Sequence, residues 1–393
     1  MGHRVGVEGV VTSSTARALM AQAALLEDGR KAKTELLEEA VRLADSDNDD
    51  DLAYDARMKL LPAANWSGDV DKMLIAFAWC VAKYESAPER DVFRAYQILW
   101  YSKWAALEAP RFPSVAKPRI AQLLDDTERR FRDHGVSLRP VYQHRHYAAV
   151  ELGDLDTAAV CYDKWWSEPR DRYADCAACE ESARLDWALT RGDDSGALEI
   201  AQDIYRRGMR CAEVPHRIYG QTLVPLLRAG RVDEAKSAYR SGIRMIAKIE
   251  HNMAADVAKH AVFLALTGNF TSAQRVWSRV LARAAEHRLP STRALVFADT
   301  ALLCDLFVAS GRARAKLPAI APLPMPVDAR GRVDVAALGA SAWSEAVRIG
   351  ALYDKRNGNG SFSAGLKAKR KLVELAVDAP LTTKRAALDV DDD

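Results

Sequence analysis

Cysteine is scarce in this sequence, with six residues among 393. So few thiols in a chain of this length do not make the disulfide framework of a secreted scaffold, and they favour a reducing compartment. Long apolar runs are also missing, because no stretch approaches the roughly 20 apolar residues of a membrane-spanning helix. The first residues, MGHRVGVEGVV, lack the apolar run of a signal peptide. We therefore expect a cytoplasmic protein that does not enter a membrane.

An excess of charge of either sign is absent too. The 56 basic and 54 acidic residues leave a net charge of +2, so no overall field attracts nucleic acid or an anionic membrane surface. The one basic cluster that could contact phosphate is LKAKRK, from Leu366 to Lys371. Four charges on one short helix usually form a solvated face. We expect no nucleic-acid partner.

Recognisable catalytic motifs are the third absence. The sequence contains no glycine-rich phosphate loop, no nucleophile elbow and no paired catalytic carboxylates. His144, His146 and Asp186 are the weak candidates for an enzyme site, and the two histidines have no third histidine or carboxylate at a spacing that suits a metal. We expect a protein that is not an enzyme.

What the sequence does contain is helical periodicity. Apolar residues recur at helical spacing through most of the chain, and alternating Val, Ile and Thr runs bounded by turn residues are missing, which predicts an all-α fold. We expect helical hairpins without clear repeat landmarks at residues 14–45, 50–85 and 90–134. The 49% hydrophobic content is enough for a large buried core.

Four segments of the chain align without gaps: LGDLDTAAVCYDKW, RGDDSGALEIAQDI, AGRVDEAKSAYRSG and TGNFTSAQRVWSRV. Their glycines are 39, 38 and 38 residues apart, namely Gly153, Gly192, Gly230 and Gly268. An alanine follows five residues after each glycine: Ala158, Ala197, Ala235 and Ala273. A left-handed residue at a helix end costs glycine least, and a small alanine lets the next helix approach closely. The pattern predicts stacked antiparallel helix hairpins.

Three of the four segments also carry a large ring nine residues after the glycine: Tyr162, Tyr239 and Trp277. This glycine, alanine and aromatic pattern resembles the tetratricopeptide repeat family over residues 140–285. The units are 38 or 39 residues long, whereas tetratricopeptide units have about 34. The resemblance implies an α-solenoid, a superhelix of stacked hairpins, that binds a protein or peptide on its concave face. It implies a non-enzymatic scaffold or adaptor.

The expected organisation has five parts. They are N-terminal helical hairpins (1–139), tetratricopeptide-like repeats (140–316), a proline-rich linker (317–332), a C-terminal helical segment (333–380) and a disordered tail (381–393). The linker prolines cannot continue a helix. An alternative function follows from this order: a ligand- or peptide-sensing regulatory module that signals through its C-terminal helices. The sequence does not fix the oligomeric state.

Four residues form the pattern Cys-x2-Cys-x31-Cys-x4-His: Cys176, Cys179, Cys211 and His216. Cys179 and His216 both fall at the start of the first helix of a repeat, and consecutive repeats are neighbours in space. Three thiolates and one imidazole are the ligands of a closed structural zinc site. We therefore expect these four residues to bind one structural zinc ion.

Two other interpretations of the cysteines remain open. Cysteines are often buried and can simply fill space between helices. A redox pair is the third interpretation, although Cys-x-x-Cys exchange normally needs an α/β setting. The segments DCAACE and RCAEVPHRIYGQTLVPLLRAGR also resemble part of bacterial tetratricopeptide proteins. That resemblance favours zinc and implies no activity.

Overall fold

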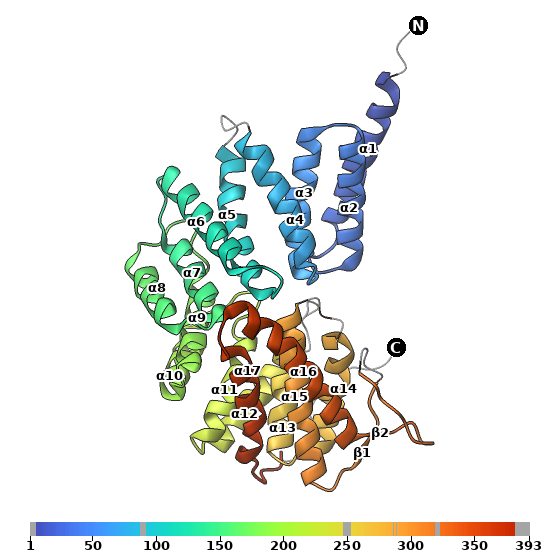
Figure 1. Ribbon diagram of the computed structural model, residues 1–393, viewed down its shortest axis with the longest axis vertical. Helices are drawn as coiled ribbons and strands as arrows, with labels where there is room; N and C mark the ends of the chain where they lie inside the picture. Colours follow the sequence, from blue (N-terminus) through green and yellow to red (C-terminus); the bar gives the residue numbers. More distant parts are fainter. Residues whose placement is uncertain are drawn as a thin grey trace. The chain divides into compact units, whose positions relative to one another are not determined.

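The chain forms helix after helix in a computed structural model that describes residues 5–86, 92–246, 253–285, 287, 289–318 and 323–381 (Figure 1). Within these residues there are 17 α-helices, two 3₁₀ helices and one pair of two-residue strands. Successive helices pack in antiparallel pairs. The predicted all-α fold of stacked helix hairpins is therefore confirmed. The predicted tail lies outside the described residues from Thr382 onward.

The described residues divide into two compact units, one up to Ala174 and one from Asp175. The helices of the first unit are α1 (Val5–Ala24), α2 (Lys31–Ser46), α3 (Asp50–Trp66), α4 (Val70–Glu85), α5 (Val92–Glu108), the 3₁₀ helix η1 (Ala109–Arg111), α6 (Lys117–Asp133), α7 (Arg139–Leu152) and α8 (Leu155–Ser167). They cover the three hairpins expected before residue 135. The carboxylate of Asp49 accepts a hydrogen bond of 3.0 Å from the Leu52 N–H and so caps α3.

The second unit contains the helices that carry the cysteine motif and the last repeats. They are α9 (Ala177–Thr190), α10 (Asp194–Arg206), α11 (His216–Arg228), α12 (Val232–Ile246), α13 (Ala254–Leu266), α14 (Phe270–Ala285), α15 (Pro290–Ala309), α16 (Val335–Asn357), α17 (Ser361–Arg370) and the 3₁₀ helix η2 (Lys371–Leu375). First helices of neighbouring hairpins also touch, since α11 packs on α13 and α13 on α15. No helix of the described chain has the length and apolar character needed to cross a bilayer.

The repeat landmarks have the structure that their spacing predicts. The four turn glycines all have positive φ, between 70° and 76°, and the four alanines that follow them are fully buried, with 0% exposure. Each glycine reverses the chain at the end of a first helix. Each alanine then lies where the second helix meets the first, so a larger side chain would force the hairpin apart.

Helix pairing continues past residue 316. Residues Arg314–Ala315 (β1) pair antiparallel with Val333–Asp334 (β2), and the Val335 N–H bonds to the Ala313 carbonyl at 3.1 Å. This pairing closes the proline-rich segment into a loop and starts α16 beside the end of α15. Helices α15 and α16 then pack along each other.

Two members of the basic cluster are used inside the fold. Lys369 Nζ lies 2.7 Å from the buried carboxylate of Asp299, and Arg370 makes a two-point ion pair with Asp305 at 2.7 and 3.0 Å. Both partners are on α15. These ion pairs bind α17 to α15, so the cluster is only partly the solvated face that the sequence suggests.

The segment after η2 returns to the repeats. The Val377 N–H donates to the Leu266 carbonyl at 2.8 Å, and the Leu381 N–H donates to Asn269 Oδ1 at 2.9 Å. Leu266 ends α13 and Asn269 precedes α14. We refer to residues 377–381 as the C-terminal strap, because they cross the α13–α14 turn.

The close approach of α12 and α13 yields a prediction. A Cβ atom added at Gly242 would lie 2.6 Å from His260 Cε1 and 2.7 Å from Tyr219 Cβ. We expect Gly242→Ala to lower the free energy of unfolding by about 1–3 kcal/mol through overpacking. Gly365→Ala, in α17 with nothing within 4 Å, is the matched control and should be neutral or stabilising by up to about 1 kcal/mol. Denaturant unfolding followed by circular dichroism tests both, and equal effects would contradict the packing argument.

Candidate metal centre

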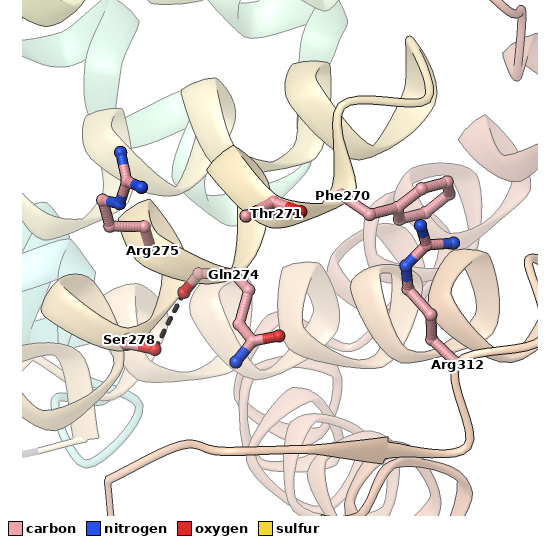
Figure 2. Close-up of a pocket in the computed structure, with 6 residues that line it drawn as sticks. All are labelled: Phe270, Thr271, Gln274, Arg275, Ser278 and Arg312. Carbon is pink, nitrogen blue, oxygen red and sulfur yellow. Dashed lines mark hydrogen bonds between the residues drawn. The ribbon is translucent and has the colours of Figure 1, made fainter. Parts of the chain in front are cut away.

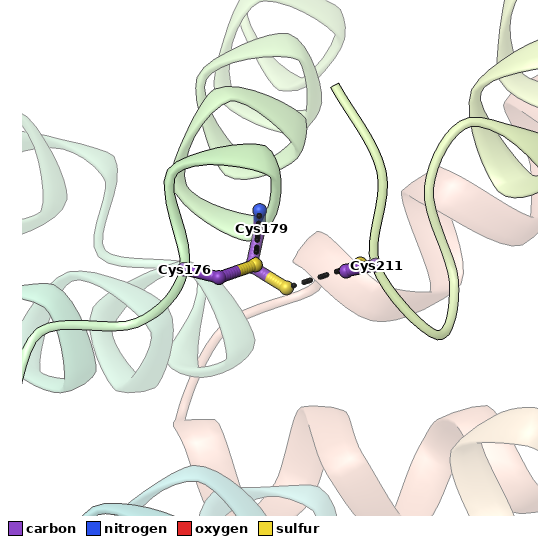
Figure 3. A group of neighbouring side chains, drawn as sticks. All are labelled: Cys176, Cys179 and Cys211. Carbon is purple, nitrogen blue, oxygen red and sulfur yellow. Dashed lines mark hydrogen bonds between the residues drawn. The ribbon is translucent and has the colours of Figure 1, made fainter. Parts of the chain in front are cut away.

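Two of the cysteines are brought together by the start of α9. Cys176 is the N-cap residue of this helix, and its sulfur accepts a hydrogen bond of 3.3 Å from the Cys179 N–H. A side chain at the N-cap and one three residues later lie at the same end of a helix. The Cys-x-x-Cys spacing therefore places both sulfurs at the N-terminus of α9 (Figure 3).

The third cysteine comes from the loop between α10 and α11. The Cys211 N–H donates to the Val214 carbonyl at 3.0 Å, and the Glu213 N–H donates to Cys211 Sγ at 3.4 Å. Val214 is buried with Ala178 of α9, which holds this loop against the start of α9. Cys179 Sγ lies 3.4 Å from Cys211 Sγ. The first turn of α9 and the loop before α11 thus present thiols that are 32 residues apart in the sequence to each other.

These three residues form a cluster that can hold a metal ion. The sulfurs of Cys176, Cys179 and Cys211 all lie within 4.8 Å of one another. Zinc–sulfur bonds of about 2.3 Å in a tetrahedron place sulfurs about 3.8 Å apart, so the cluster has the right size. Cys176 is exposed and the other two are half-buried. The Cys179 thiol donates a hydrogen bond to Cys211, and this bond lowers the pKa of Cys211 below its usual value.

His216 is not part of this cluster. It is the first residue of α11, five residues after Cys211, and it is 6% exposed. Among the described residues, the group whose ligand atoms come within 4.8 Å of one another here consists of the three cysteines. The structure therefore brings together three of the four residues that the sequence selects. His216 as the fourth ligand stays a prediction.

The other three cysteines fill space in the helix packing. Cys80, Cys161 and Cys304 are all buried free thiols, and burial raises the pKa of each. A buried thiol with a raised pKa is a poor nucleophile and a poor metal ligand. The packing interpretation thus applies to these three residues.

The histidine pair of the sequence is also buried and hydrogen-bonded. His144 Nδ1 lies 2.7 Å from the Pro140 carbonyl, and His146 Nδ1 lies 2.9 Å from the Ala158 carbonyl. The His146 ring packs among aromatic rings, including that of Trp165 at 6.0 Å between centroids. Burial lowers the pKa of His146. These contacts are those of packing residues.

Asp186 belongs to a polar network that joins first helices. Its carboxylate lies 3.2 Å from Arg217 Nη2 and accepts a short hydrogen bond from Gln221 Nε2. Burial raises the pKa of Asp186, while Arg217 acts in the opposite direction. This network connects α9 to α11.

Two residues that sequence reasoning missed extend the same face onto α13. Lys259 Nζ lies 2.8 Å from Asp256 Oδ1. Burial raises the pKa of Asp256, but Lys259 and Arg217 outweigh it and hold that pKa below its usual value. The repeat spacing could have identified Lys259, because Gln221 and Lys259 both stand nine residues before a turn glycine. Equivalent positions of neighbouring repeats lie close together.

Comparison of the chain with protein-family models and with curated proteins finds no match. The function of this chain is therefore inferred from the arrangement of its side chains. That arrangement offers a three-cysteine cluster and a polar face on consecutive first helices.

A buried histidine beside this face gives a pH prediction. His260 is fully buried, no described residue hydrogen-bonds its ring nitrogens, and its ring lies 5.7 Å from that of Tyr239. Burial lowers the pKa of His260 to about 4, against an ordinary value of 6.5, although Asp256 acts to raise it. Since the unfolded chain binds the proton more tightly, stability should be full above pH 6.5 and fall as the pH drops toward 4. The loss is about 3 kcal/mol.

The variant His260→Phe removes the titrating ring and keeps an aromatic ring at this position. We expect its free energy of unfolding to change less than that of the native chain between pH 6.5 and 4, measured by urea titration at several pH values. His134→Phe, at an exposed position, is the control and should keep the loss of stability that we assign to His260. If the free energy of unfolding changes equally with pH in the native chain and in His260→Phe, the prediction is wrong.

Proposed function

We propose that this chain is a non-enzymatic tetratricopeptide-like scaffold or adaptor that binds a protein or peptide through the face carried by its first helices. In a solenoid of this family that face would be the concave one. We further propose that Cys176, Cys179 and Cys211 hold one structural zinc ion.

The observation that carries the scaffold proposal is the polar network across consecutive first helices. Asp186 on α9 pairs with Arg217 and Gln221 on α11, and Lys259 and Asp256 continue the face on α13. Arg217 and Lys259 keep 33% and 32% of their side chains exposed. A partner can therefore reach charged groups that the fold itself holds in place, which favours specific recognition.

The zinc proposal is supported by the ligand type and the distances. Thiolates are the ligands that zinc takes in structural sites, and the three sulfurs already lie close together. A metal ion there would tie the start of α9 to the loop before α11, which stabilises the contact between two hairpins. His216 is the fourth ligand that the sequence predicts.

Metal analysis tests the zinc site. We expect the purified chain to contain one zinc ion per molecule, and Cys176→Ser and Cys211→Ser each to remove it and to lower the thermal midpoint. Structural zinc binding contributes about 10 kcal/mol or more in zinc-finger peptides, so the shift should be large. The control Cys161→Ala changes a thiol outside the cluster and should keep the zinc. His216→Ala decides the fourth ligand, and a native chain without metal would contradict the site.

A charge reversal tests the binding face. Lys259→Glu places a negative charge beside Asp256 on the proposed face, whereas Glu199→Lys changes an exposed residue of α10. We expect proteins captured by the native chain from cells of its source to be lost with Lys259→Glu and retained with Glu199→Lys. Quantitative mass spectrometry of the captured proteins provides the measurement. If both variants capture the same set as the native chain, another surface is responsible.

The alternative function, a ligand- or peptide-sensing module, is favoured by one observation. The C-terminal helices are attached to the repeats, because Arg370 pairs with Asp305 of α15 and the C-terminal strap bonds across the α13–α14 turn. A ligand that changed the repeats would therefore act directly on α17 and the strap. This attachment gives the sensing proposal a physical route.

A further inference from the structure

The second unit contains a cavity that the scaffold proposal does not use. It has a volume of about 270 Å³ and lies between α14 and the segment leading into β1 (Figure 2). Its lining residues are Phe270, Thr271, Gln274, Arg275, Ser278 and Arg312. The Ser278 hydroxyl already donates to the Gln274 carbonyl at 2.8 Å, so the lining offers two guanidinium groups, the Thr271 hydroxyl and the second N–H of the Gln274 amide. None of these six residues has a carboxylate. Such a lining donates hydrogen bonds to an anion.

Arg312 is held in place before any ligand arrives. Its guanidinium carbon lies 4.4 Å from the centroid of the Phe270 ring, and Phe270 in turn packs edge-on against Phe307 at 5.2 Å. One guanidinium nitrogen donates to the carbonyl and the hydroxyl of Ser310 at 3.3 and 3.0 Å. A guanidinium that is already ordered loses less conformational entropy when it binds.

Within the part of the chain that the structure describes, both arginines of the cavity lack a charge partner. Among the described residues, no carboxylate forms an ion pair with Arg275 or Arg312, and both are exposed. Elsewhere in this unit arginines such as Arg231 and Arg370 pair with carboxylates at 2.7 Å. Two uncompensated positive charges therefore line one cavity, and a bound anion would gain from both.

The far wall of the cavity is fixed by the protein's own contacts. Gln274 Nε2 donates to the Lys316 carbonyl at 3.1 Å, and β1 is paired with β2 just before that residue. The wall formed by residues 312–316 is thus tied to α14 and to the start of α16. The backbone that carries Arg312 is thus held beside α14, which carries Arg275, by the protein's own hydrogen bonds.

We propose that this cavity binds clustered carboxylates of an acidic peptide. A carboxylate presents two oxygens that match the paired N–H groups of a guanidinium, and neighbouring carboxylates can engage Arg275 and Arg312 together. The site lies on α14, so the proposal does not depend on the face of α9, α11 and α13 described above.

Acidic peptide of this kind has two sources. One is another protein, and the other is this chain, whose sequence contains Asp389 and the run Asp391–Asp393. The strap fixes Leu381 to Asn269 at 2.9 Å, directly before Phe270 of the cavity. The eight residues from Leu381 to Asp389 span up to about 26 Å when extended. The chain's own aspartates are therefore within reach of the site.

Peptide binding to the full chain tests the proposal. The probe is a fluorescent peptide with the sequence of residues 382–393, TTKRAALDVDDD, and the receptor is the full chain with Asp389 and Asp391–Asp393 changed to Asn. We expect binding that is lost when the peptide aspartates become asparagine, and that falls at least about tenfold in Arg275→Gln/Arg312→Gln. The matched control is Arg279→Gln, because Arg279 is an exposed arginine of α14 outside the lining. It should bind the probe as the unchanged receptor does.

The outcomes separate the sources. Weaker probe binding by the native chain than by the Asn-substituted chain identifies the chain's own aspartates as the occupant, and equal binding identifies an acidic segment of another protein. Arg312→Lys keeps the charge but loses the paired N–H geometry, so intermediate binding supports the site even if a double variant misfolds. Absence of binding, unchanged binding by a double variant with a native circular dichroism spectrum, or displacement of the probe by equimolar inorganic phosphate would overturn the proposal.

Discussion

The fold depends on how closely the two helices of each hairpin can approach. A left-handed glycine reverses the chain, and a fully buried alanine five residues later lies where the helices meet. This geometry repeats every 38 or 39 residues, so equivalent positions of successive hairpins become neighbours. Contacts between residues about 31 to 35 apart, such as Asp186 with Arg217 and Gln221, follow from that register. The polar face and the cysteine cluster are both products of it.

The cysteine cluster combines a local and a non-local determinant. Cys176 and Cys179 meet because an N-cap residue and the residue three positions later share a helix end. Cys211 joins them only because α9 and the loop before α11 lie against each other. The three thiols therefore come together, and can bind a metal ion, only when the two hairpins are stacked. Metal binding and hairpin stacking would therefore stabilise each other.

The sequence predicts the hairpins and three members of the cluster because their signals are periodic. Turn glycines and buried alanines constrain the backbone directly. The repeat spacing places His216 at the start of α11. The direction of its side chain depends on packing, which the spacing does not predict. The pairing of α16 with α15 was hidden by the proline-rich segment, since two short strands close that loop and repeat spacing is lost. The stacking of Arg312 on Phe270 joins residues 42 positions apart. The repeat spacing does not predict it, because Arg312 lies after the last repeat glycine.

Linear repeat arrays usually open from their ends, because a terminal unit contacts only one neighbour. Here the C-terminal strap bonds Leu381 to Asn269, 112 residues earlier in the chain. Because of that bond, the end of the chain contacts the α13–α14 turn as well as the helix before it. Fraying of the final helix then also removes the hydrogen bonds that the strap makes to the α13–α14 turn. The last third of the protein should consequently exchange its amide protons as one cooperative block, without a gradient toward residue 381.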